Sequence, residues 1–217
     1  MNLVLASASP RRRELLTQAG FAFTVHPAHI PEDTLPNEDP IAYVVRLARQ
    51  KAEAVLTQLA SKPAAPCLAP DAWENANPDV ARRNDDNRQL TVLGADTTVT
   101  LDSLILAKPA DASDAARMLR LLSGRTHRVI TGVALATARR TEVAAEVTGV
   151  RFLTLSEQEI ADYVATGEPM DKAGAYAIQG RAARWIPRIT GDYFNVVGLP
   201  LALVSTMLEA TSARALH

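Results

Sequence analysis

Residues 7–12, with the sequence Ser-Ala-Ser-Pro-Arg-Arg, have the composition of a site for phosphate or another small anion. The apolar residues 3–6 predict a buried strand, and Ser9 followed by Pro10 predicts the N-cap and the first residue of a helix. The first N–H groups of a helix have no partner within it, and arginine donors match phosphate oxygens. We therefore expect an anion site here, although an ordinary capped helix with solvated arginines fits the same residues.

Asp96 is the second candidate, because it follows the apolar residues 90–93, which predict a strand. Ligands of open α/β sheets gather at the ends of strands. A carboxylate at such an end could hold a divalent metal or take a proton from water. An aspartate that only caps a turn would give the same local pattern.

The third candidate is the segment 171–180, in which glycines bracket small residues. Such a backbone can pass close to a ligand. Its polar members include Lys172 and Gln179, and the amide of Gln179 offers both a donor and an acceptor to the edge of a base. A glycine-rich connection without a ligand is the alternative reading.

Four further residues are supporting candidates or structural residues. Lys51, Lys108 and Glu32 could assist an anion or metal site, although such side chains are usually solvated surface charges. His127 is expected to be a structural histidine rather than a base or a metal ligand.

The elements expected around these residues alternate between strands and helices. Helices are expected after Ser9, from Asp39–Pro40, from Asp111 or Ser113, from the capping box at 156–159, and after Pro200. The helix from Asp39–Pro40 is expected to have one apolar face, formed by Val44, Leu47, Ala48, Ala52 and Val55. Further strands are expected at 21–25, 129–136 and 146–153. This order predicts one α/β domain over residues 1–217, with a mixed, twisted central sheet flanked by helices and a loop insertion at about 61–90.

Composition and charge argue against several classes of protein. Twenty-three basic and 24 acidic residues give a net charge of −1, which does not favour a general nucleic-acid binder. No apolar run reaches the about 18 residues that a membrane span needs. The chain begins with apolar residues and only then turns basic, which is the reverse of a signal peptide, so we expect a cytoplasmic protein.

Taken together, these segments resemble the Maf family of nucleoside triphosphate pyrophosphatases, also described as septum-formation inhibitors. The resemblance covers nearly the whole chain. Its segments are LASASPRRRELL at 5–16, LARQKA at 47–52, GADTTV at 94–99, LAKP at 106–109, SGRTHRVITGV at 123–133, EPMDKAGAYAIQG at 168–180 and GDYFNVVGLP at 191–200. Small departures occur at Ser103, Ala107 and Ala177, where the family usually has glycine.

The resemblance implies an elongated, two-lobed Maf- and ITPase-like fold with a deep cleft. It implies hydrolysis between the α- and β-phosphates of a nucleoside triphosphate, giving the monophosphate and pyrophosphate, with Mg²⁺ or Mn²⁺ as cofactor. A homodimer is a further expectation. Asp96 matches the catalytic residue, and Arg11, Thr97 and Gln179 match positions tied to substrate choice in the dTTP and UTP branch.

We combine these roles into one hypothesis for the cleft. Ser7, Ser9 and Lys172 complete the expected substrate site, and Arg12, Lys51 and Lys108 surround the phosphates. Asp96 and Glu32 are the expected metal ligands. Two alternatives stay open: the 7-methyl-GTP branch of the family, and a non-enzymatic nucleotide-binding regulator of cell division.

Overall fold

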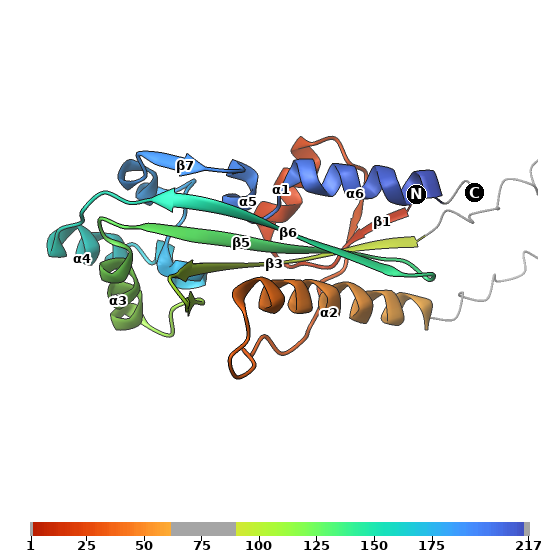
Figure 1. Ribbon diagram of the computed structural model, residues 1–217, viewed down its shortest axis with the longest axis horizontal. Coiled ribbons are helices and arrows are strands. Elements are labelled where there is room, and N and C mark those ends of the chain that lie inside the picture. Colours follow the sequence, from red (N-terminus) through yellow and green to blue (C-terminus); the bar gives the residue numbers. More distant parts are fainter. Residues whose placement is uncertain (1, 62–89, 215–217) are drawn as a thin grey trace, which may run out of the picture.

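The computed structural model describes residues 2–61 and 90–214. The predicted insertion at 61–90 lies outside these ranges, apart from its two end residues. The protein is elongated, and its long strands run along its length (Figure 1). Within the described ranges, no helix is both long and apolar enough to cross a membrane.

The central sheet is mixed, as the sequence predicts. Its strand order is β2-β1-β3-β5-β6-β7, and β4 pairs with β3 outside this path. β1 is parallel to β2 and β3, and the other pairs are antiparallel. The strands are β1 (Asn2–Leu5), β2 (Thr24–Val25), β3 (Leu90–Leu101), β4 (Leu104–Leu106), β5 (Thr126–Ala136), β6 (Thr141–Arg151) and β7 (Arg188–Thr190). The strand expected at 21–25 is thus shorter, and the one expected at 146–153 begins earlier.

Helices cover both faces of this sheet, with α2 on one face and α1 and α6 on the other (Figure 1). The predicted N-caps Ser9, Asp39 and Asp111 and the capping box at Ser156 are all present. The helices are α1 (Pro10–Gln18), α2 (Pro40–Ala60), α3 (Ala112–Leu122), α4 (Glu157–Ala165), α5 (Tyr193–Val197) and α6 (Leu201–Arg214), with 3-10 helices η2 (Glu168–Asp171), η3 (Ala173–Ala175) and η4 (Arg181–Trp185).

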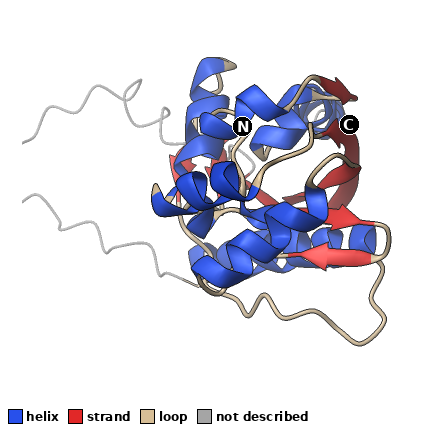
Figure 2. Ribbon diagram, turned by 90° about the vertical axis from the view of Figure 1, so that its left-hand side faces the viewer, coloured by secondary structure: helices blue, strands red, loops and turns tan. Residues whose placement is uncertain are grey.

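The hydrophobic core divides along the long axis, which gives the molecule its two lobes. At one end, side chains of β1, β3 and β5 pack against α1 and α6 on one face and against α2 on the other. At the other end, Val99 and Leu101 of β3 pack with α3, α4 and the 3-10 helices. Figure 2 looks along the long axis from this second end, where α3 and α4 lie.

The edge of β3 that faces β1 is interrupted where the two lobes meet. β1 pairs with residues 90–93 of β3, and β4 pairs with residues 99–101, so residues 94–98 have no strand partner on this edge. β5 pairs continuously along the other edge. Asp96 therefore lies in the middle of a strand, not at its end as the sequence suggested, because the β-branched residues that follow it continue the strand.

Two glycines allow α2 to lie directly against the sheet beside Asp96. Gly132 is the partner of Asp96 on β5, and Gly94 lies two residues earlier on β3, on the same face. A Cβ atom on Gly94 would come within 2.9 Å of the backbone N of Ala52, and a Cβ on Gly132 would come within 2.7 Å of the backbone N of Val45. Only glycine fits at this close approach.

We predict that Gly132→Ala destabilises the protein by about 1–3 kcal/mol, because the new methyl group must push the α2 backbone from the sheet. Gly149→Ala is the matched control on the neighbouring strand, where the nearest atom to the new Cβ is 3.8 Å away. Urea unfolding of both variants checks this. Equal stability of the two variants would contradict the close approach of α2.

His127 is a buried structural histidine in the second lobe. Its Nε2 lies 2.8 Å from Tyr176 Oη, and its ring packs edge-on against Phe152 and Tyr176. Burial lowers the pKa of His127 to about 4. The unfolded chain, with an ordinary histidine pKa of about 6.5, therefore takes up a proton at a higher pH than the folded protein does.

The second prediction follows from this shift. Between pH 6.5 and 4 the wild type should lose up to about 3 kcal/mol of stability through His127. His127→Phe loses the bond to Tyr176 but also loses this pH dependence. The unfolding free energies of the two proteins should therefore converge as the pH falls from 7 to 4, measured by urea titration at each pH. Parallel curves would show that His127 is not held neutral by burial.

Candidate active site

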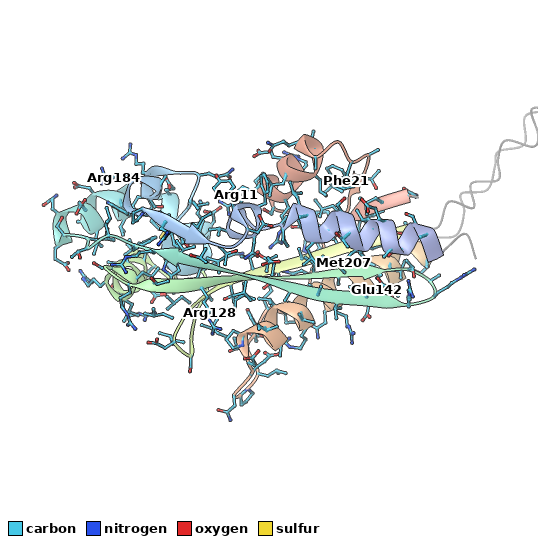
Figure 3. The ribbon with its side chains drawn as sticks, turned by 45° about the horizontal axis from the view of Figure 1, so that its top comes forward. Arg11, Phe21, Arg128, Glu142, Arg184 and Met207 are labelled. Carbon is cyan, nitrogen blue, oxygen red and sulfur yellow. The ribbon has the colours of Figure 1, made fainter. Side chains whose placement is uncertain are left out.

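A pocket of about 530 Å³ opens between the two lobes, beside the edge of β3 that has no strand partner. In Figure 3, Arg11 marks the middle of the long axis, between Arg184 near one end and Glu142 near the other. The pocket brings together every site residue expected from the sequence: Ser7, Ser9, Arg11, Arg12, Glu32, Lys51, Asp96, Thr97, Lys108, Lys172 and Gln179.

The centre of the pocket is a buried ion pair between α2 and β3. Lys51 Nζ lies 2.7 Å from Asp96 Oδ1 and 2.6 Å from Glu32 Oε1. The side chains of Lys51 and Asp96 are 9% and 11% exposed, whereas that of Glu32 is 44% exposed. One ammonium group thus lies between two carboxylates, one buried and one open to the solvent.

The two carboxylates differ in proton affinity. Burial raises the pKa of Asp96, and the positive charges of Lys51 and Arg12 only partly offset this effect. Burial would also raise the pKa of Glu32, but the hydrogen bond and charge of Lys51 hold it below the ordinary value. Asp96 is therefore the better proton acceptor of the two, because its conjugate acid is the more favoured.

The position of Lys51 on α2 explains its burial. Val44, Leu47, Ala48, Ala52 and Val55 form the buried face of this helix, as the sequence predicts, and Lys51 lies on the same face. Lys51 is thus not the solvated surface charge that a lysine usually is. The same face carries Tyr43, which sequence reasoning missed. Tyr43 Oη donates a hydrogen bond of 2.9 Å to the Glu32 backbone oxygen and lines the pocket.

Arg12 closes the interrupted edge of β3. Its guanidinium donates to Ala95 O (2.8 Å), Gly198 O (2.8 Å), Thr97 Oγ1 (3.0 Å) and Ser7 Oγ (3.2 Å). Four of the five N–H donors of an arginine are therefore directed at protein acceptors. Arg12 supplies charge to the pocket, but most of its hydrogen bonds fasten α1 to β3 and to the residue that ends α5.

Thr97 lies on the face of β3 opposite to Asp96, since successive side chains of a strand alternate. Its hydroxyl accepts from Arg12 and lies 2.9 Å from Thr131 Oγ1. Thr131 in turn donates to the backbone oxygen of the buried Asn195. The role of Thr97 in substrate choice stays a prediction, and its visible contacts are with Arg12 and this network.

The capped helix start that the sequence predicts is present at α1, and its role as an anion site stays a prediction. Ser9 caps the helix by accepting from the Arg12 N–H, and Ser7 Oγ accepts from the Ser9 N–H at 3.2 Å. Arg11 and Lys108 also line the pocket, and neither makes an ion pair or hydrogen bond with the described residues. Their cationic groups are therefore available to an anionic ligand.

The segment with Gln179 forms the wall contributed by the second lobe. Lys172 Nζ donates to Glu168 O at 2.8 Å and pairs with Asp171, so it holds its own turn together. Gln179 is exposed and makes no hydrogen bond within the described residues. Its amide is therefore free to meet a ligand. Small apolar residues complete this end of the pocket: Val99, Ala107, Ala173, Ala177 and Ile178.

The arrangement suits a ligand with a highly charged end and a flat, less polar end. Arg11, Lys108 and the α1 N-terminus can neutralise phosphates, and Asp96 can accept a proton beside them. The apolar wall near Gln179 can accommodate a ring. A nucleotide has both parts.

Comparisons with known proteins identify the family of the chain. The family model described as "Maf-like protein" matches residues 2–211. A dTTP/UTP pyrophosphatase of Koribacter versatilis is 50% identical over 209 residues, which cover 96% of this chain and 94% of that protein. Proteins with the same name from Salmonella typhimurium and Bacillus pumilus are 47% and 43% identical, over 97% and 95% of this chain and 93% and 95% of theirs. The chain therefore belongs to the Maf family.

Proposed function

We propose that the protein hydrolyses dTTP and UTP to the nucleoside monophosphate and pyrophosphate. The observation that carries the proposal is the buried Lys51–Asp96 pair beside an open, positively charged helix start. The names of the relatives supply the substrates, because each is called a dTTP/UTP pyrophosphatase.

The chemistry assigned to Asp96 is general base catalysis. Asp96 takes a proton from a water molecule while the water oxygen attacks the α-phosphorus of the triphosphate. The bond from the α-phosphorus to the bridging oxygen breaks, and pyrophosphate leaves with its electron pair. Lys51 holds the carboxylate in position through Oδ1, which leaves Oδ2 for the water.

The other cations act on the charge that the reaction moves. Negative charge on the leaving pyrophosphate favours contact with Arg11 and Lys108, which make no hydrogen bond or ion pair with residues 2–61 and 90–214. The start of α1 adds a fixed positive potential that needs no rearrangement during the reaction. Arg12 contributes charge and keeps α1 against β3.

A divalent cation is part of the proposal, with Asp96 and Glu32 as its protein ligands. No group of three potential metal-binding side chains lies within residues 2–61 and 90–214. Two carboxylates nevertheless suit Mg²⁺ or Mn²⁺, because Mg²⁺ usually binds through one or two carboxylates together with substrate phosphates. When bound, such an ion neutralises phosphate charge and polarises the phosphorus–oxygen bonds. Location in the cytoplasm and pairing of two copies also belong to the proposal.

The third prediction tests the substrate. The protein is incubated with Mg²⁺ and dTTP, UTP, CTP or 7-methyl-GTP, and pyrophosphate and monophosphate are measured. We expect both products from dTTP and UTP, much less from CTP and 7-methyl-GTP, and loss of turnover when the metal is chelated. Preferential turnover of 7-methyl-GTP would place the protein in the other branch. Absence of pyrophosphate from every nucleotide would favour the non-enzymatic regulator.

A further inference from the structure

The segment 177–181, which presents Gln179 to the pocket, is held at both ends by one pair of side chains outside it. Tyr163 of α4 and Glu168 of η2 form this pair, and neither lines the pocket. Tyr163 Oη donates to Glu168 Oε1 at 2.8 Å. We refer to the two side chains as the Tyr163–Glu168 brace.

Each member of the brace holds one end of the segment. The Ala177 N–H donates to Tyr163 Oη at 3.2 Å. The Arg181 N–H donates to the Glu168 carboxylate, with distances of 3.1 and 3.3 Å to its two oxygens. The residue two positions before Gln179 and the residue two positions after it thus each donate a backbone hydrogen bond to the brace.

A side chain at position 180 would require the Glu168 carboxylate to move from its place in the brace. A Cβ atom on Gly180 would overlap the Glu168 carboxylate, with Oε2 at 2.9 Å and Oε1 and Cδ closer still. The carboxylate therefore lies directly against the backbone that follows Gln179. This close approach gives Gly180 a purpose that the sequence pattern alone does not reveal.

The brace itself is anchored in the core of the second lobe. Tyr163 is 2% exposed, and its ring packs edge-on against Trp185 with 5.1 Å between centroids. Trp185 Nε1 donates to Glu159, which also closes the capping box of α4. The segment is thus connected to a rigid helix rather than to the solvent.

We propose that Tyr163 and Glu168 are positioning residues that fix the Gln179 segment for base recognition, and that they thereby set the preference for uracil and thymine over cytosine. This inference rests on the proposed function, the hydrolysis of pyrimidine nucleoside triphosphates to the monophosphate and pyrophosphate. Uracil and cytosine have similar shapes but opposite hydrogen-bonding groups at position 4 and at N3 of the ring. Backbone donors and acceptors that are held in place reject the base with the opposite pattern, because the polar groups of the site would then be left unpaired.

The fourth prediction compares three variants by the ratio of kcat/KM for UTP to kcat/KM for CTP. Tyr163→Phe keeps the buried ring but removes the hydroxyl that connects Ala177 to Glu168. Glu168→Ala removes the other half of the brace. Both should lower the ratio by about tenfold or more, mainly through a lower KM for CTP and a higher KM for UTP. Glu168→Gln keeps acceptors for Tyr163 and Arg181 and should retain most of the wild-type ratio.

Ser156→Ala is the matched control. It removes the N-cap hydroxyl of the same helix, α4, but leaves the bonds that Glu159 accepts from the Ser156 N–H and from Trp185 Nε1, and it touches neither Tyr163 nor Glu168. It should lower Tm and leave the UTP/CTP ratio unchanged. Hydrogen exchange of the nucleotide-free protein gives an independent readout, because the amides of 177–181 should exchange faster in Tyr163→Phe than in Ser156→Ala.

The outcomes separate this inference from the function on which it rests. A lower ratio with faster exchange in Tyr163→Phe and Glu168→Ala, but not in Ser156→Ala, supports the brace. If the wild type hydrolyses UTP but the UTP/CTP ratio is unchanged in Tyr163→Phe and Glu168→Ala, the role of the brace is overturned and the proposed function stands. An equal fall of the ratio in Ser156→Ala also overturns it, since stability would then be the cause. Lack of UTP turnover by the wild type overturns the proposed function and the inference with it.

Discussion

The structure depends on the contact between Lys51 and Asp96, which joins α2 to the middle of β3 at 2.7 Å. Neither charge is well solvated, so removal of Lys51 would leave the buried Asp96 carboxylate without its ion-pair partner, whereas removal of the Asp96 charge leaves Lys51 its ion pair with Glu32. The pair forms only because α2 lies against the sheet at Gly94 and Gly132. Stability and the proposed chemistry therefore have the same origin, since the contact that neutralises Asp96 also holds it in the pocket.

The interruption of β3 makes this contact accessible. Where β1 ends and before β4 begins, the edge of β3 carries no partner strand, and Arg12 donates to the Ala95 carbonyl in its place. A side chain can satisfy one carbonyl and still leave space beside it, whereas a strand would close the gap. The pocket thus lies where the sheet lacks a strand, with the start of α1 on the first lobe and the Gln179 wall on the second.

Much of this arrangement is encoded locally and could be predicted from the sequence. The Ser9 cap, the buried face of α2 and the capping box at Ser156 depend on residues within one or two helical turns, and all are confirmed. The prediction that Asp96 lies at the end of its strand was wrong, because the β-branched residues after it continue β3. The burial of Lys51 could have been predicted from the sequence, because Lys51 lies on the apolar face of α2. The contacts of Tyr163 and Glu168 with the Gln179 segment span up to 14 residues without a periodic signal and required the structure.

The most direct test of the account is the turnover of dTTP by Asp96→Asn, measured beside the binding of a non-hydrolysable dTTP analogue. Asparagine keeps the shape of the side chain but cannot serve as the base. We predict that kcat falls by about 10²–10⁴-fold, while the analogue still binds and the protein stays folded. Asp102→Asn, just beyond the same strand and exposed, is the control and should keep normal turnover. Near-normal pyrophosphate release by Asp96→Asn would contradict the central claim.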